Sequence, residues 1–188
     1  NFVAALGNGG TLYQPRVIDR ILPVTGDPTY VFTPVVLGTL PISPENLTIL
    51  QQAMYSVVMN PRGTAYRSGT FGLNSFVSNT GIPIYGKTGT AEAGYGDSHA
   101  WFAGYSDANR ENKPDIAVAV LVENGGEGSE IAAPIFRRVM EIYFQGAAQI
   151  RYPWEALVGV VATPTPLVTD TPVLDETATP EGTATVAP

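Results

Sequence analysis

The chain has 188 residues, of which 44% are hydrophobic, with 20 Gly, 16 Pro and no Cys. This length suits one globular domain rather than two well-buried ones, and the lack of cysteine excludes disulfide scaffolds, thiolate zinc sites and cysteine nucleophiles. A net charge of −7 disfavours nucleic-acid binding, and no apolar run reaches the roughly 18 residues of a membrane span.

The first residues predict the end of a helix. Phe2-Val-Ala-Ala-Leu6 is apolar and is followed by Gly7-Asn-Gly-Gly10, a sequence that stops helices. Because such a helix would begin before residue 1, we expect the chain to be a fragment of a longer protein. Leu12 to Leu22 then predicts a strand, with Pro15 placing it at an edge or beside a bulge.

A helix is predicted from Ser43, where Ser as N-cap precedes Pro44 at the first helical position. Its apolar residues recur at helical spacing, and Asn60-Pro-Arg-Gly63 ends it. Residues 68–81 are a polar stretch rich in Gly, Ser and Asn, to which no element is assigned.

Three strands and a closing helix are predicted next. The strands are the apolar run 82–85 leading into a Gly-Lys-Thr-Gly-Thr segment, then 100–105 and 116–122, joined by loops rich in Gly, Asp and Asn. Residues 130–144 carry apolar side chains at helical spacing. The pattern predicts an α+β fold, an antiparallel sheet with helices packed on it.

The end of the chain differs in composition. Residues 163–188 hold eight Thr, five Pro and four acidic residues, with no aromatic or basic residue. Such a tract buries too little apolar surface to order itself, so we predict a disordered tail. The predicted organisation is therefore a body at 1–148, an exit segment at 149–162 and the tail at 163–188.

One motif has two interpretations. Gly81-Ile-Pro-Ile-Tyr-Gly86-Lys87-Thr88 matches the phosphate-binding P-loop pattern. A P-loop needs a helix that starts at the Lys-Thr pair, but the preceding residues favour extended chain and glycines follow. Nucleotide binding is therefore the weaker interpretation. The same residues read as Lys-Thr-Gly on a strand, a signature of serine acyl-transferases that react with penicillin.

The surrounding motifs make the second interpretation specific. Their ordered set resembles the C-terminal part of the transpeptidase domain of class B penicillin-binding proteins, of the elongation or division type, over about residues 1–148. The motifs are Asn8-Gly-Gly-Thr-Leu-Tyr-Gln-Pro15, Gly63-Thr-Ala65, Gly86-Lys-Thr-Gly-Thr-Ala-Glu92, His99-Ala-Trp-Phe-Ala-Gly-Tyr105, Val118-Ala-Val-Leu-Val-Glu-Asn-Gly-Gly126 and Ala132-Ala-Pro134.

The resemblance implies a partial penicillin-binding transpeptidase fold, related to serine β-lactamases, and a D,D-transpeptidase that cross-links peptidoglycan stem peptides through an acyl-serine. It further implies trapping by β-lactams, partnership with other cell-wall synthesis proteins, and a place outside the cytoplasmic membrane, anchored by a segment upstream of this chain. Neither a metal nor any other cofactor is implied, and no nucleic-acid partner.

Acyl transfer to serine needs a cation, oxyanion donors and a strand edge for an extended peptide. Lys87 supplies the charge, Gly89 allows close approach to the backbone, and the hydroxyls of Thr88 and Thr90 suit a peptide carboxylate. By resemblance, Lys87 and Thr90 are assigned catalytic roles, the N–H of Thr90 forming half of the oxyanion hole. Thr88, Gly89 and Thr90 are assigned to substrate binding.

Two motifs of the family are missing from the sequence. No Ser-x-x-Lys precedes either lysine, Lys87 or Lys113, and no Ser-x-Asn occurs. We expect both to lie upstream of Asn1, so this chain alone is predicted to be inactive. A non-catalytic penicillin-recognition module remains the alternative, with a P-loop domain and a β-lactamase as weaker ones.

The remaining polar candidates have structural interpretations. Asp97-Ser-His99 holds the three residue types of a catalytic triad, but neighbours in extended chain point to opposite sides, so we expect His99 to make only a local hydrogen bond. Trp101 and Phe102 alternate on a strand, so one of them faces the core. Arg137 and Arg138 lie late in a helix, where we expect them to complement its dipole without a partner.

Overall fold

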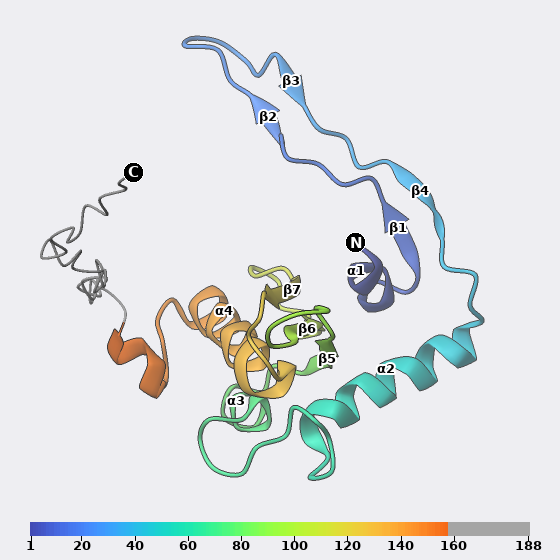
Figure 1. Ribbon diagram of the computed structural model, residues 1–188. Helices are drawn as coiled ribbons and strands as arrows, with labels where there is room; N and C mark the ends of the chain where they lie inside the picture. The colour runs from blue at the N-terminus through green and yellow to red at the C-terminus, as the bar shows by residue number, and fades with distance from the viewer. Residues whose placement is uncertain (158–188) are drawn as a thin grey trace, which may run out of the picture. The chain divides into compact units, whose positions relative to one another are not determined.

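The computed structural model describes residues 1–157 and divides into two units, Asn1–Pro153 and one that begins at Trp154. The first unit holds four α-helices, seven strands and a π-helical turn, η1; a 3-10 turn, η2, begins at Pro153 (Figure 1). The predicted tail and the end of the predicted exit segment lie outside the described residues. Among those described, no helix is both long and apolar enough to cross a bilayer.

The body is built on an antiparallel sheet with the strand order β5-β6-β7. The strands are β5 (Ile84–Ala91), β6 (His99–Ser106) and β7 (Ala117–Val122). Their register sets Gly89 opposite Trp101, which in turn lies opposite Leu121. The three predicted strands and the α+β class are thus confirmed. Strand β5 extends beyond the apolar run 82–85 from which it was predicted.

One face of the sheet forms the main core, because alternate residues of each strand point into it. Ile84, Phe102 and Val120 pack there against α3 (Leu73–Thr80) and α4 (Ala133–Gln145). The rings of Phe102 and Phe136 lie 4.6 Å apart. Gly86 is required beneath them, since a Cβ at this position would lie 2.3 Å from the Phe102 ring.

The opposite face is covered at one end by α1 (Phe2–Gly7) and α2 (Pro44–Met59). Tyr105 stacks on Tyr85 with ring centroids 4.8 Å apart, and burial raises the pKa of both phenols. The start of α2 is as predicted: Ser43 Oγ accepts a hydrogen bond from the Asn46 N–H at 3.3 Å. Serine capping and the apolar stripe together fix this helix.

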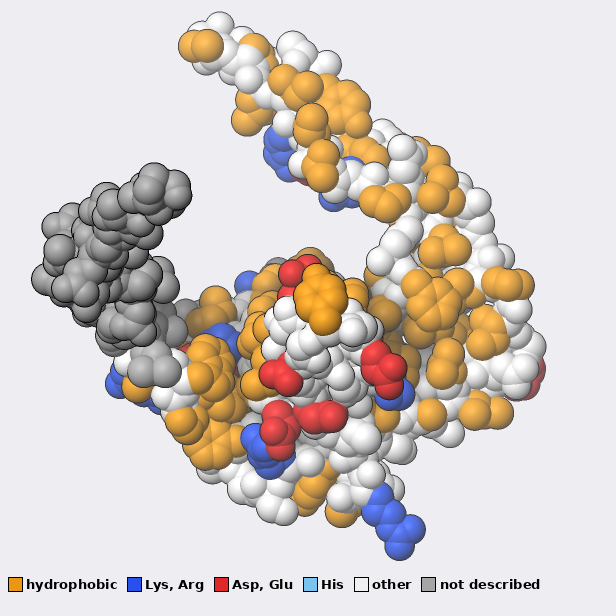
Figure 2. Space-filling model, viewed as in Figure 1, with side chains coloured by type: hydrophobic (Ala, Val, Ile, Leu, Met, Phe, Trp, Pro, Cys, Tyr) orange, Lys and Arg blue, Asp and Glu red, His pale blue; other side chains and the backbone are white. Residues whose placement is uncertain are grey.

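Residues 11–39 form a two-stranded ribbon, here called the arm, rather than the single strand predicted over 12–22. Its paired segments are short, namely β1 (Thr11–Tyr13) with β4 (Val36–Thr39), and β2 (Arg20–Ile21) with β3 (Tyr30–Val31). Pro15 lies where the first strand stops, because proline lacks the N–H that a ladder needs. Figure 2 shows hydrophobic side chains along the arm; Val17 and Val24 are fully exposed.

The stretch 68–81 contains a helix that the sequence interpretation missed. Helix α3 begins after Gly72 and ends at Gly81, whose φ of 67° gives the left-handed cap. Leu73, Phe76 and Val77 are buried at helical spacing. That spacing was present in the sequence, but only three apolar residues among polar ones carried it.

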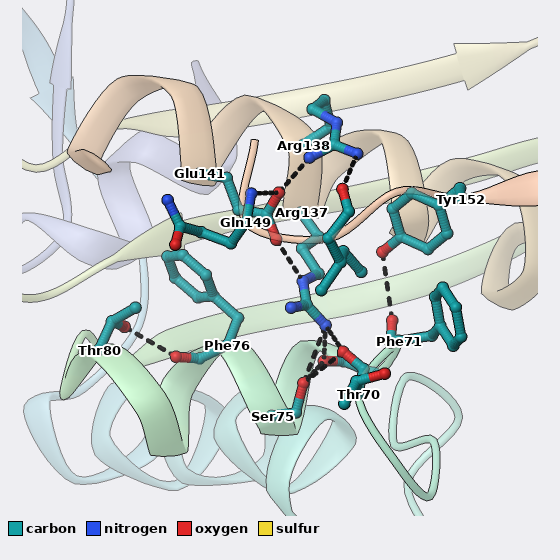
Figure 3. A network of polar contacts seen from close by, with 12 residues as sticks. Thr70, Phe71, Ser75, Phe76, Thr80, Arg137, Arg138, Glu141, Gln149 and Tyr152 are labelled. Carbon is teal, nitrogen blue, oxygen red and sulfur yellow. Dashed lines mark hydrogen bonds and ion pairs between the residues drawn. The ribbon is translucent and has the colours of Figure 1, made fainter. Parts of the chain in front are cut away.

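Neither Arg138 nor Arg137 lies in the last turn of α4, and both pair with Glu141. The expectation was therefore wrong for both, most clearly for Arg137. Its side chain is only 2% exposed and donates hydrogen bonds from α4 to the carbonyls of Thr70 and Gly72 and to Ser75 Oγ, holding the segment that starts α3 (Figure 3). Glu141, one turn along α4 and fully buried, accepts from Arg137 Nε at 2.8 Å. A guanidinium this deeply buried needs a carboxylate and carbonyl partners, because a helix dipole alone cannot offset its desolvation.

Candidate active site

The four predicted site residues all lie on β5, the outer strand of the three-stranded sheet. Lys87 and Thr90 are exposed, Gly89 is half-buried, and Thr88 is 8% exposed. On one side β5 pairs with β6, and its other edge has no strand partner among the described residues. An outer strand with unpaired backbone groups is the kind of surface on which an extended peptide can lie.

Lys87 gives this strand its positive charge. Its Nζ donates a hydrogen bond to the carbonyl oxygen of Thr88 at 2.5 Å, which turns the ammonium along the strand. An ammonium has three donors, so two remain for other groups. The Lys87 ammonium therefore lies at the backbone carbonyl of Thr88.

The Thr88 hydroxyl is engaged inside the protein. Its Oγ1 lies 2.6 Å from Thr64 Oγ1, and the two hydroxyls share a hydrogen bond. Thr64 follows α2 in a turn where Gly63 is needed, since a Cβ there would meet the carbonyl oxygens of Ser56 and Val57 at 2.4 and 2.3 Å. No sequence pattern indicated this pairing, because Thr64 and Thr88 are far apart in the chain.

Close backbone packing surrounds Gly89. A Cβ at Gly89 would lie 3.1 Å from the Cβ of Trp101 on β6. From η1 (Gly128–Ala132), Gly128 packs so closely that its own Cβ would meet the carbonyl oxygens of Gly89 and Trp101 at 2.3 Å. Glycine at 128 therefore lets the loop after β7 lie directly on the β5–β6 pair, whereas glycine at 89 gives room to Trp101 on β6.

Thr90 is held by a residue that the sequence interpretation did not single out. The Thr90 hydroxyl donates a hydrogen bond to Glu127 Oε2 at 2.8 Å. The Asn124-Gly-Gly126 sequence indicated a turn at this point, but not that the chain then folds back on β5.

The structure also tests the other interpretations of the sequence motifs. Lys87 and Thr88 lie inside a strand and Gly81 caps α3, so the geometry contradicts a P-loop, whose lysine and threonine begin a helix. His99 Nδ1 accepts a hydrogen bond from the Asn124 N–H at 3.0 Å, the local role expected for it. Phe102 is buried and Trp101 is partly exposed, as their alternation predicted. Within residues 1–157 no group of three or more acidic or histidine side chains could hold a metal ion.

The sequence matches known proteins along most of its length. Residues 1–141 match the model of the family described as "Penicillin binding protein transpeptidase domain". The chain is 44% identical over 75 residues to the peptidoglycan D,D-transpeptidase PbpA of Mycobacterium tuberculosis, which covers 35% of this chain. It is 32% identical over 108 residues to the peptidoglycan D,D-transpeptidase MrdA of Haemophilus influenzae, which covers 50% of it. The chain spans 15% of the length of each of these relatives.

Solved structures give the same result. Penicillin-binding protein A from M. tuberculosis, as an imipenem acyl-enzyme complex, superposes with a TM-score of 0.55 at 28% identity, covering 74% of this chain and 28% of that one. Penicillin-binding protein 2B from Streptococcus pneumoniae superposes with a TM-score of 0.58 at 24% identity, covering 80% and 24%, and it supports the fold alone.

Proposed function

Since the chain belongs to the family of penicillin-binding protein transpeptidase domains, we propose that it forms one wall of the active site of a peptidoglycan D,D-transpeptidase. In this proposal the gene product cross-links stem peptides by acyl transfer through a serine, is acylated by β-lactams, and works with other cell-wall synthesis proteins outside the cytoplasmic membrane. Residues 1–148 are proposed to be the C-terminal part of its transpeptidase domain.

The observation that carries the proposal is the placement of the Lys-Thr-Gly-Thr motif on an outer strand, with the side chains of Lys87 and Thr90 both exposed. Acyl transfer from a peptide that ends in a carboxylate needs a cation for that carboxylate and N–H donors for the oxyanion. In this proposal Lys87 supplies the cation, the Thr90 N–H is an oxyanion donor, and the Thr90 hydroxyl binds the substrate carboxylate.

Thr88 and Gly89 are proposed to bind substrate beside Lys87 and Thr90. Either hydroxyl of the Thr64–Thr88 pair is able to be the donor, so when Thr64 donates, the Thr88 proton is left for a peptide carboxylate at the strand backbone. Gly89 keeps that stretch of backbone free of a side chain, which allows a peptide to approach closely.

The nucleophile is proposed to lie in a part of the gene product beyond these 188 residues, since the sequence holds no Ser-x-x-Lys. A Ser-x-x-Lys element places a serine and a general base on successive turns of a helix, side by side on one face. Without it the chain supplies binding and electrostatic groups but no acyl acceptor, so the isolated chain is proposed to be inactive.

Labelling with a fluorescent penicillin tests the proposal. We expect covalent labelling of the full-length gene product, and a fall of about 100-fold or more in the labelling rate for Lys87→Ala, the scale of losing one electrostatic contact to a transition state. Lys113→Ala is the matched control, because Lys113 is the only other lysine and its ammonium lies over the Tyr143 ring, 4.2 Å from the centroid. A folded gene product that takes no label would instead be a non-catalytic recognition module.

A further inference from the structure

The hydrogen bond between Thr90 and Glu127 has a consequence for the ligand of Thr90. A threonine hydroxyl has a single proton to donate. Here that proton points to Glu127 Oε2 across 2.8 Å. A substrate carboxylate needs the same proton, because a carboxylate only accepts hydrogen bonds.

The segment that carries Glu127 is fixed at several points. Residues 123–128, here called the strap, are tied to the start of β6 by two hydrogen bonds, from Gly126 N–H to the Ser98 carbonyl at 2.8 Å and from Asn124 N–H to His99. Gly128 then packs against the backbone of Gly89. The strap therefore holds the backbone of Glu127 beside Thr90.

The Glu127 side chain has no structural task of its own in this turn. Its backbone carbonyl accepts from the N–H groups of Glu130 and Ile131, at 3.1 and 3.0 Å, whereas its carboxylate makes no cap hydrogen bond. The carboxylate is exposed, so it is able to turn into solvent when another group takes its place. Replacing the side chain therefore leaves the backbone bonds of the turn intact.

We infer that Glu127 is a specificity-determining residue of the proposed site, because its carboxylate occupies the Thr90 hydroxyl where the carboxylate of an acyl donor would bind. This inference rests on the proposed function. An anionic donor must displace a like charge and take over the hydroxyl proton, whereas a donor without a carboxylate meets neither obstacle. Glu127 thus weakens the first, non-covalent binding of anionic donors and leaves the acylation step unchanged.

The concentration dependence of penicillin labelling separates these two effects. In the full-length gene product, Glu127→Gln and Glu127→Ala are expected to lower the half-saturating penicillin concentration about three- to tenfold, the range of one competing hydrogen bond, with the same limiting rate. Glu130→Gln is the matched control. It removes an equal charge from the same turn, but Glu130 faces Arg67, 3.8 Å away, and should leave both values unchanged.

A penicillin with an esterified carboxyl group sharpens the test. For this neutral probe, the wild-type protein and both Glu127 variants should have equal half-saturating concentrations. Labelling of the wild-type protein with no change in half-saturation for either variant would overturn the inference alone, and so would an equal gain for the ester. Failure of the wild-type protein to label would overturn the proposed function, and the inference with it.

Discussion

Two polar clusters of this domain are built in opposite ways. The first, in α4, joins Arg137, Arg138 and Glu141, and every interaction ends on a protein group: the Glu141 carboxylate also accepts from the Gln149 N–H at 3.0 Å, and Arg138 donates to the Ile150 carbonyl at 2.6 Å. The second, at β5, is the Thr90–Glu127 hydrogen bond together with Lys87, three residues before Thr90 on the strand, and all three residues are exposed.

The difference separates stability from chemistry. A buried charge must be paired, because an unpaired one costs several kcal/mol, and the charges of the α4 cluster are paired with one another. At β5, the Lys87 ammonium makes one hydrogen bond and has two further donors. The Thr90 hydroxyl donates to the exposed Glu127 carboxylate, which is able to turn into solvent. Charge alone therefore does not identify a site in this chain: the buried charges of α4 are paired with one another, whereas the charged groups at β5 are exposed.

The largest effect is expected from Glu141→Ala. This change leaves Arg137 buried without its carboxylate, and we expect the free energy of unfolding of the full-length gene product to fall by about 3–5 kcal/mol. Denaturant titration measures it, with the exposed Glu111→Ala as the control. A loss no greater than that of the control would remove the basis of the comparison.

Thr90→Val is expected to slow the reaction with penicillin and to leave stability unchanged, the reverse of Glu141→Ala. Loss of the hydroxyl should slow penicillin labelling about tenfold or more, the value of a hydrogen bond to a charged group, while the thermal midpoint stays unchanged. Thr25→Val, on the arm, is the control for the substitution itself. A lowered midpoint with an unchanged labelling rate would place Thr90 with the structural residues.

Gly128→Ala tests the link between the strap and β5. The added Cβ would meet two carbonyl oxygens at 2.3 Å, so we expect a destabilisation of about 1–3 kcal/mol and a displaced strap. Hydrogen exchange of the strap amides reports the displacement, with Ser129→Ala as the neighbouring control. Unchanged exchange and stability would show that the packing on Gly89 is not tight.

Tyr105→Phe is expected to have the smallest effect. Among the described residues the buried Tyr105 hydroxyl has no hydrogen-bond partner, so its removal should leave stability unchanged or raise it by up to about 1 kcal/mol. Burial raises the pKa of this phenol because it disfavours the phenolate. Below pH of about 10 the phenol is neutral in both the folded and the unfolded state, and as the pH rises further the folded state loses stability. Unfolding titrations at neutral and alkaline pH should therefore show a smaller alkaline loss for Tyr105→Phe, and an equal loss would contradict this account.

Local sequence patterns predicted the helices and strands that bury one face against the core. Apolar alternation and spacing gave β6, β7, α2 and most of α4, because each buries one face. The arm was predicted wrongly because its side chains are exposed and its pairing is set by proline and turns. The partner of Arg137 at Thr70, the Thr64–Thr88 pair and the Glu127–Thr90 bond join distant parts of the chain, and no periodicity reports such contacts.

Mapping the penicillin adduct tests the central claim most directly. After incubation of the full-length gene product with penicillin, digestion and mass spectrometry locate the acylated residue. If β5 is one wall of an acyl-serine site, the adduct lies on the serine of a Ser-x-x-Lys element outside these 188 residues, and its yield in a timed reaction falls sharply in Lys87→Ala. An adduct on a serine of this chain, or an equal yield in Lys87→Ala, would contradict the account.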